Sequence, residues 1–249
     1  MDFGGRTVAF KSLVGSHNYN LNTPESDKDY KVFVLPTFDD LYFNNSFSKS
    51  YIGETEDFDI HDIRKCSSLW YKANVNFLEV LFSKRFLVNA ELDDKSKLLI
   101  YQIYDMRNDI AKMNLKYLYD ACIGMHYNKM KYLEKGTEGT KHLVEKYGYD
   151  TKQAVNDWRI LDFLRAFADN EFTDFKAAIW YSEDNIKRKF LLDLKNGMFS
   201  LNEYKEIVTN TFNHVEENYK DIYRGQELDE NTNNKLLEVI KELVRINLV

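Results

Sequence analysis

Two aspartates separated by one residue, Asp27 and Asp29, stand directly before a stretch that alternates as a strand does, residues 31–35 (KVFVL). Alternate side chains of a strand point to the same face, so the two carboxylates would project together, about 6–7 Å apart along the chain. Two carboxylates on one face repel, and a divalent cation that prefers oxygen ligands relieves that repulsion. The spacing indicates a metal site, whereas an ordinary polar turn entering a strand is the competing interpretation.

A glycine and a serine, Gly15 and Ser16, precede the aspartates, with residues 17–26 between them. The backbone N–H groups of such a turn can hold a phosphate if a helix begins there. A Gly-Ser pair, a gap of this length and an Asp-x-Asp sequence together resemble the signature of the DNA polymerase β-like nucleotidyltransferase superfamily. That superfamily usually has an apolar residue between the two carboxylates, where this chain has Lys28.

A third carboxylate is expected from the alternating stretch 57–61 (DFDIH). Its odd positions share one face, while Phe58 and Ile60 would face the core. In a polymerase β-like site the third carboxylate comes from a neighbouring strand and is flanked by apolar residues, which favours Asp59. Asp57 remains the alternative, and an ordinary half-exposed strand is the plainer interpretation. Asp62 is expected to cap the helix that follows.

Composition bounds the possible functions. The 249 residues include 44% hydrophobic ones, enough for a substantial core, and contain no apolar run long enough for a membrane span. The N-terminus lacks the basic and apolar regions of a signal peptide, so a cytoplasmic protein is expected. Cys66 and Cys122 lie in helical patterns and are predicted to be reduced core residues. The net charge of −6 restricts any site for a polyanion to a local patch.

The hydrophobic pattern predicts an α+β fold. Residues 29–35 are expected to form a strand, residues 36–50 a loop over the site, and residues from Ile63 onward a helical pattern broken at 74–76. Residues 6–14 fit a helix or a strand. Further helices are expected at 92–108, 109–135, 139–147, 151–168, 171–196 with a break, 200–220 and 230–247. We therefore predict a nucleotidyltransferase-like head with a small mixed sheet at 1–90 and a helical domain at 91–249.

A second informative stretch is 147–153 (YGYDTKQ). Gly148 would end one helix, and Asp150 with Gln153 has the spacing of a capping box, so the next helix should begin near Thr151. Lys152 then falls in the first turn, where a cation opposes the helix dipole by about 0.3–1 kcal/mol. It is either a solvated lysine or a contact for the phosphate of a nucleotide or nucleic acid.

Over nearly its full length the chain resembles one bacterial and phage branch of the superfamily, which includes the polymerase β-like protein of RNA-repair gene clusters. Four stretches carry the resemblance: 15–30, 62–81, 149–154 and, more weakly, the helical pattern from Asn202 onward. The departures are Ala73 and Val75, where a glycine and a proline are expected, and Gln153, where histidine is usual.

The resemblance implies an Mg²⁺- or Mn²⁺-dependent enzyme with two ions that transfers a nucleoside monophosphate from an NTP to an acceptor hydroxyl and releases pyrophosphate. The implied metal ligands and catalytic residues are Asp27, Asp29 and Asp59. The implied nucleotide contacts are Gly15, Ser16, Tyr19, Ser26 and Lys152. An RNA or tRNA 3′ end, a protein hydroxyl and a small-molecule hydroxyl remain open as acceptors, as do the base and the oligomeric state. The alternative is a non-catalytic nucleotide-binding or antitoxin-like partner-binding module.

Overall fold

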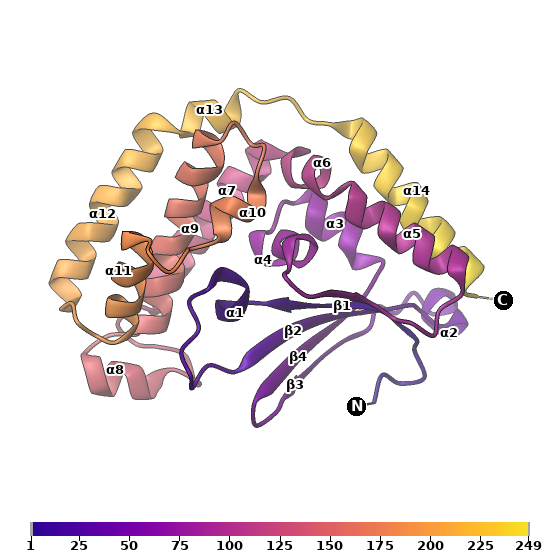
Figure 1. Cartoon of the computed structure of the whole chain (residues 1–249), viewed down its shortest axis with the longest axis horizontal. Helices are drawn as coiled ribbons and strands as arrows, with labels where there is room; N and C mark the ends of the chain where they lie inside the picture. The colour runs from indigo at the N-terminus through magenta and orange to yellow at the C-terminus, as the bar shows by residue number, and fades with distance from the viewer. Residues whose placement is uncertain (1, 249) are drawn as a thin grey trace. The chain divides into compact units, whose positions relative to one another are not determined.

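The computed structural model describes residues 2–248 and has an α+β fold (Figure 1). The chain divides into two compact units. The first unit comprises the residues up to Asn114 and those from Glu227 onward, and the second comprises Leu115–Gln226. This division differs from the predicted boundary at residue 90, because residues 91–114 and the last helix of the chain also belong to the first unit.

The first unit contains a five-stranded mixed sheet with the strand order β3-β4-β2-β1-β5 (Figure 1). The strands are β1 (Val8–Val14), β2 (Lys28–Val34), β3 (Ser48–Ile52), β4 (Glu56–Asp62) and β5 (Phe86–Val88). Strands β2 and β4 are parallel, and the other neighbouring pairs are antiparallel. The predicted strands at 29–35 and 57–61 are confirmed, and the ambiguous segment 6–14 contains strand β1.

Eight helical segments of the first unit accompany the sheet in the described residues. They are α1 (Ser16–Tyr19), α2 (Phe38–Tyr42), α3 (Lys65–Tyr71), α4 (Val75–Leu78), the 3₁₀ helix η1 (Glu79–Phe82), α5 (Asp94–Asp105), α6 (Arg107–Lys112) and α14 (Glu230–Ile246). The prediction of a loop over residues 36–50 is wrong, because Thr37 caps α2 in a complete capping box and β3 begins within the same stretch.

The transition from β4 to α3 also differs from the prediction. Asp62 is the last residue of β4, whereas α3 begins at Lys65 after the N-cap residue Arg64. The Asp62 carboxylate instead accepts a 2.9 Å hydrogen bond from the Arg64 backbone N–H. The predicted break at 74–76 is confirmed, since Asn74 is the N-cap of α4 and accepts from the backbone N–H of Asn76.

Both faces of the sheet are covered by side chains. Val32, Val34 and Ile60 form a buried cluster on one face. On the other face Phe33 stacks on Phe10 and contacts His61, whose ring in turn packs edge-to-face on a side chain of α4. Cys66 and Cys122 are both buried and free, as predicted, and burial raises the pKa of the Cys66 thiol.

Helix α14 returns the end of the chain to the first unit, where it packs on α5 and α3. Its buried residues recur at helical spacing and give it an amphipathic face. They are Thr232, Leu236, Val239, Ile240, Leu243 and Val244. An ion pair of 2.9 Å joins Glu242 of α14 to Lys95 of α5.

The described part of the second unit is helical. Its helices are α7 (Leu115–Tyr132), α8 (Lys141–Tyr147), α9 (Thr151–Asp169), α10 (Phe175–Ile179), α11 (Ile186–Lys195), α12 (Leu201–Asn218) and α13 (Lys220–Arg224). Gly148 ends α8 with a φ of 81°, and Asp150 caps α9 by accepting from the Gln153 backbone N–H at 3.0 Å, as predicted. The reciprocal side-chain bond of a capping box is absent, because the Gln153 Oε1 atom has no hydrogen-bond partner. Within residues 2–248 we find no helix with the length and apolar character needed to cross a membrane.

Candidate active site

The Gly-Ser turn lies at the end of β1, where Gly15 leads into α1. Gly15 has a φ of 69° and a ψ of −150°, a combination that is essentially restricted to glycine. A Cβ atom at this position would lie 2.6 Å from Oδ2 of Asp29, on the adjacent strand. The turn thus needs glycine for two reasons, its backbone conformation and the close approach of a carboxylate.

A buried carboxylate supports the turn from the inside. Glu79, the first residue of η1, is 3% exposed. Its Oε2 atom accepts from the backbone N–H of Gly15 at 3.3 Å and from Nδ2 of Asn18 at 3.4 Å. The Oδ1 atom of Asn18 accepts from the backbone N–H of Lys84 at 3.1 Å. These bonds join the turn to the segment that follows α4.

The loop between α1 and β2 is also tied to the turn. The Nε2 atom of His17 hydrogen-bonds the carbonyl oxygen of Ser26 at 3.0 Å and is therefore its donor. The Ser26 hydroxyl closes its own turn by accepting from the Thr23 backbone N–H at 2.9 Å. Asp27 is exposed just before β2, whereas Tyr19 is 4% exposed in the core. Of the predicted nucleotide contacts, Tyr19 thus has a core position and Ser26 a structural bond.

The parallel register of β2 and β4 brings two carboxylates together. Asp29 lies opposite Asp57, and in a parallel pair such neighbours point to the same face of the sheet. Adjacent strands are about 4.8 Å apart, so these side chains are immediate neighbours. Asp57 accepts one hydrogen bond from the backbone N–H of Gly53 at 3.1 Å. Asp29 and Asp57 therefore form a carboxylate pair beside the Gly-Ser turn, which begins where β1 ends.

Asp59, the favoured third carboxylate, lies two residues further along and has a different environment. It lies opposite Lys31, whose Nζ atom donates to Asp59 Oδ2 at 2.8 Å. His61 Nε2 lies 2.8 Å from the same oxygen, and the Ser50 hydroxyl donates to Oδ1 at 3.1 Å. Lys31 also packs over the ring of Phe77, with its Nζ 4.4 Å from the ring centroid. The Asp59 carboxylate is therefore the shared hydrogen-bond acceptor of a polar cluster formed with Lys31, His61 and Ser50.

The pKa of Asp59 reflects this cluster. Partial burial raises it, but the hydrogen bonds from His61 and Lys31 outweigh burial and lower the pKa well below its ordinary value. A cation already neutralises this carboxylate, so a metal ion would have to displace Lys31. His61 is only 8% exposed, and its ring packs edge-to-face on Phe77 of α4.

The donor set determines which metal could bind. No three metal-ligating side chains of the described residues 2–248 converge on one point. Mg²⁺ is usually held by one or two carboxylates, and water and substrate phosphates complete its octahedron. The Asp29–Asp57 pair fits this mode, and the exposed Asp27 lies two residues before Asp29. The carboxylates therefore suit an ion that arrives with a nucleotide better than a closed metal site.

Two basic residues, Arg64 and Lys152, come from elements other than β2 and β4. Arg64 forms an ion pair with the fully buried Asp62 at 2.5 Å and also donates to the carbonyl oxygen of Asn45. Lys152 belongs to the second unit, where it is exposed in the first turn of α9. Sequence reasoning missed Glu79 and Lys31. The alternation of β2, which puts Lys31 on the face of Asp29, was the signal that could have indicated the lysine.

Comparison with known proteins adds no assignment. No protein-family model matches the sequence, and a search of the curated proteins found no significant match.

Proposed function

We propose that the first unit is a metal-dependent nucleotidyltransferase of the polymerase β-like type. One observation carries the proposal: the carboxylate of Asp29 lies against Gly15 of the Gly-Ser turn and beside Asp57 of the next strand. This arrangement joins the Gly-Ser turn, where Ser16 offers a hydroxyl and a backbone N–H as hydrogen-bond donors, to a pair of acidic oxygen ligands. A nucleoside triphosphate with its divalent cation needs both kinds of group.

The residues would divide the work as follows. Asp29 and Asp57, with Asp27 from the loop, would hold Mg²⁺ or Mn²⁺, and the hydroxyl and backbone N–H of Ser16 in the Gly-Ser turn would bind the terminal phosphates. When bound, the two ions would neutralise the triphosphate and lower the pKa of the acceptor hydroxyl. The acceptor oxygen attacks the α-phosphorus, its proton passes to a carboxylate, and the bond to the β-phosphate breaks to release pyrophosphate. Positioning and charge neutralisation would supply most of the rate.

The third carboxylate of the proposal is Asp57 in place of Asp59. The strand register favours Asp57, because it lies opposite Asp29, while Lys31 lies opposite Asp59. The ion pair of 2.8 Å between Lys31 and Asp59 leaves that carboxylate with a cation of its own. Asp59 would then act as a positioning residue that holds the sheet face under the site.

The decisive experiment is isothermal titration of the four NTPs with and without Mg²⁺, on the wild-type chain and on Asp29→Asn. We expect Mg²⁺-dependent binding of at least one NTP that is lost in the variant. Incubation with the preferred NTP labelled at the α-phosphate, together with RNA, a protein extract or small hydroxyl compounds, then identifies the acceptor. No binding of any NTP to the folded protein would contradict the proposal.

Two observations favour a second candidate, a non-catalytic nucleotide-binding or partner-binding module. The described residues contain no preformed group of three metal ligands, and Asp59 is neutralised by Lys31. Such a module would bind an NTP without transferring its α-phosphate. Binding in the titration without incorporation of label into any acceptor would support this candidate over the enzyme.

A further inference from the structure

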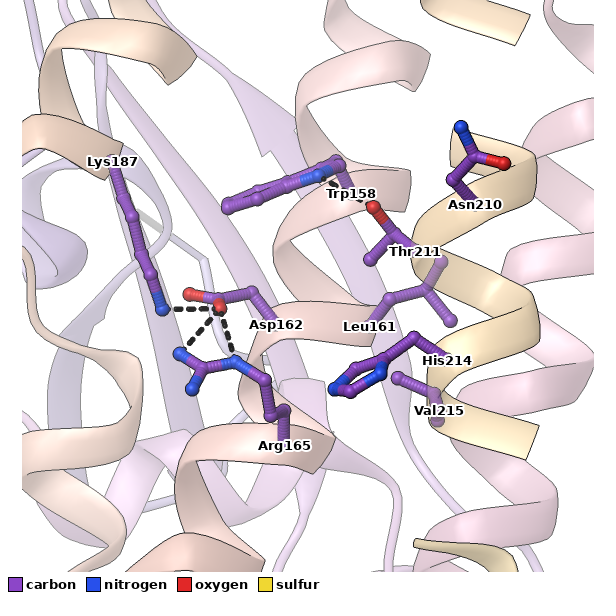
Figure 2. Close-up of a pocket in the computed structure, with 9 residues that line it drawn as sticks. All are labelled: Trp158, Leu161, Asp162, Arg165, Lys187, Asn210, Thr211, His214 and Val215. Carbon is purple, nitrogen blue, oxygen red and sulfur yellow. Dashed lines mark hydrogen bonds and ion pairs between the residues drawn. The ribbon is translucent and has the colours of Figure 1, made fainter. Parts of the chain in front are cut away.

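The second unit contains an open pocket of about 340 Å³ between side chains of α9, α11 and α12 (Figure 2). Sites for small ligands have volumes of about 300–1,000 Å³, so this pocket has the size for one small organic molecule. Charged side chains from α9 and α11 gather at one end, and side chains of α12 lie along the opposite side (Figure 2). No motif of the sequence indicated this site.

A buried carboxylate holds two cations at the pocket. Asp162 is 5% exposed, and its Oδ1 atom accepts from Lys187 Nζ at 2.6 Å and from Arg165 Nη2 at 3.0 Å. Its Oδ2 atom accepts from the hydroxyl of Tyr181 at 3.2 Å. The side chains of Lys187 and Arg165 are 32% and 31% exposed. Both cations can therefore be reached from solvent, whereas the Asp162 carboxylate that binds them is buried. Both charges are therefore fixed in place before any ligand arrives.

The pocket has more donors than its own acceptors use. The ammonium of Lys187 carries more N–H groups than its bond to Asp162 needs. The guanidinium of Arg165 also pairs with the exposed Asp169 at 2.8 Å and still has N–H groups left. On α12 the Nδ1 atom of His214 accepts from Asn218 Nδ2 at 3.1 Å, which leaves the ring proton on Nε2. This excess of donors favours an anionic ligand with several oxygen atoms.

An aromatic wall adds a second chemical feature. The Nε1 atom of Trp158 donates to the hydroxyl of Thr211 at 3.1 Å, and its ring packs edge-to-face on Phe190 with a centroid distance of 4.9 Å. Both contacts fix the orientation of the indole, which lines the pocket beside the buried apolar residues Leu161 and Val215. A flat ring can stack on an indole without a requirement for one particular base.

We propose that this pocket binds a nucleoside monophosphate group, with the base against Trp158 and the phosphate bound by Lys187, Arg165 and His214. A free mononucleotide and the 5′-phosphorylated end of an RNA strand present the same chemistry. The site consists only of residues of the second unit, so it does not depend on nucleotidyl transfer by the first.

The test is isothermal titration of the full chain with AMP, adenosine and inorganic phosphate in the presence of EDTA. We expect saturable binding of AMP and at least tenfold weaker binding of adenosine and of phosphate. Equal affinity for phosphate and AMP would overturn the nucleoside part of the proposal, and no saturable binding of AMP would overturn it altogether. A short RNA with and without a 5′-phosphate separates the sources, because only a terminal-nucleotide site prefers the phosphorylated strand.

Matched variants locate the binding. Lys187→Gln should weaken AMP binding at least tenfold, whereas Lys189→Gln, at an exposed position of the same helix, should leave it within twofold. His214→Leu changes an exposed residue and serves as the second variant if loss of Lys187 impairs folding; it should weaken binding at least threefold. Wild-type affinity in both Lys187→Gln and His214→Leu would refute the assignment to this pocket.

Discussion

Asp57 lies opposite Asp29 in the parallel register of β4 and β2, on the same face of the sheet. Two residues further along, the same register pairs Asp59 with Lys31, and the two form an ion pair of 2.8 Å. Two carboxylates side by side on one sheet face favour metal binding, whereas a carboxylate that is ion-paired with a lysine does not. The strand register therefore separates a candidate ligand from a candidate structural residue.

Replacing these aspartates one at a time distinguishes the two roles. We expect Asp29→Asn and Asp57→Asn each to lower nucleotidyl transfer at least a hundredfold, because each removes a negative ligand without changing side-chain shape. Asp59→Asn should retain activity within tenfold. Steady-state rates with the preferred NTP provide the measurement, and circular dichroism checks the fold. If Asp59→Asn abolished nucleotidyl transfer while Asp57→Asn remained active, the register-based assignment would be wrong.

Loss of the Lys31–Asp59 ion pair should lower the stability of the protein more than its activity. Asp59→Asn leaves a lysine side chain that is only 12% exposed without its charged partner. We expect a loss on the order of 1 kcal/mol in the free energy of unfolding, at the low end for bonds to charged groups because Asp59 is 39% exposed. Urea titration at pH 7 measures this loss.

The same pair predicts the sign of a pH effect. A carboxyl whose pKa is lowered in the folded state stabilises it fully above the unfolded pKa, here 3.8, and loses this contribution as the pH falls further. The stability difference between the wild type and Asp59→Asn should therefore be constant from pH 7 to about pH 5 and shrink below pH 4. A difference that grows on acidification would contradict the assigned direction of the shift.

Gly15→Ala should affect both stability and nucleotide binding. The backbone conformation of Gly15 costs other residues about 1–3 kcal/mol, and the new Cβ would also collide with the Asp29 carboxylate. Gly148→Ala is the matched control, since Gly148 also has a positive φ but no atom near its Cβ position. Urea unfolding should show the larger loss at Gly15.

A double-mutant cycle isolates the collision with Asp29. In an Asp29→Ala background, the additional cost of Gly15→Ala should fall to the backbone contribution alone, since the carboxylate is gone. An unchanged cost in that background would mean that Asp29 does not restrict the turn.

Glu79→Ala should loosen the Gly-Ser turn. The variant removes the acceptor that serves the Gly15 backbone N–H and Asn18 Nδ2 inside the protein. We expect a loss of about 1–3 kcal/mol in the free energy of unfolding and faster hydrogen exchange at the Gly15 amide. Glu91→Ala, at an exposed position, should change neither quantity. Unaltered exchange at Gly15 in Glu79→Ala would exclude the supporting role.

Helix α14 should be essential to the first unit. Leu243 is fully buried, and Leu243→Ala should lower the free energy of unfolding by about 2–5 kcal/mol. Leu237 belongs to the same helix but is 43% exposed, so Leu237→Ala should cost far less. Thermal and urea unfolding compare the two variants, and equal losses would show that the packed face of α14 is assigned incorrectly.

Local interactions allowed the sequence to determine much of this molecule. Helical spacing located most of the helices after residue 60, and Asp150 was predicted as an N-cap because capping depends on a bond to a backbone N–H three residues away. The strand period likewise placed 57–61 in a strand with its aspartates on one face. The short helix α2 and strand β5 were not predicted, because neither contains enough residues to show a hydrophobic period.

The tertiary structure decided the remainder through contacts between distant residues. Asp57 and Asp59 share a face, so a period of two cannot choose between them, and only the pairing of β4 with β2 sets which one lies opposite Asp29. The bond from Gly15 to Glu79 spans 64 positions, and α14 joins the first unit from the far end of the chain. Backbone pairing and burial of apolar faces fix these relationships, and neither has a signature in any single stretch of sequence.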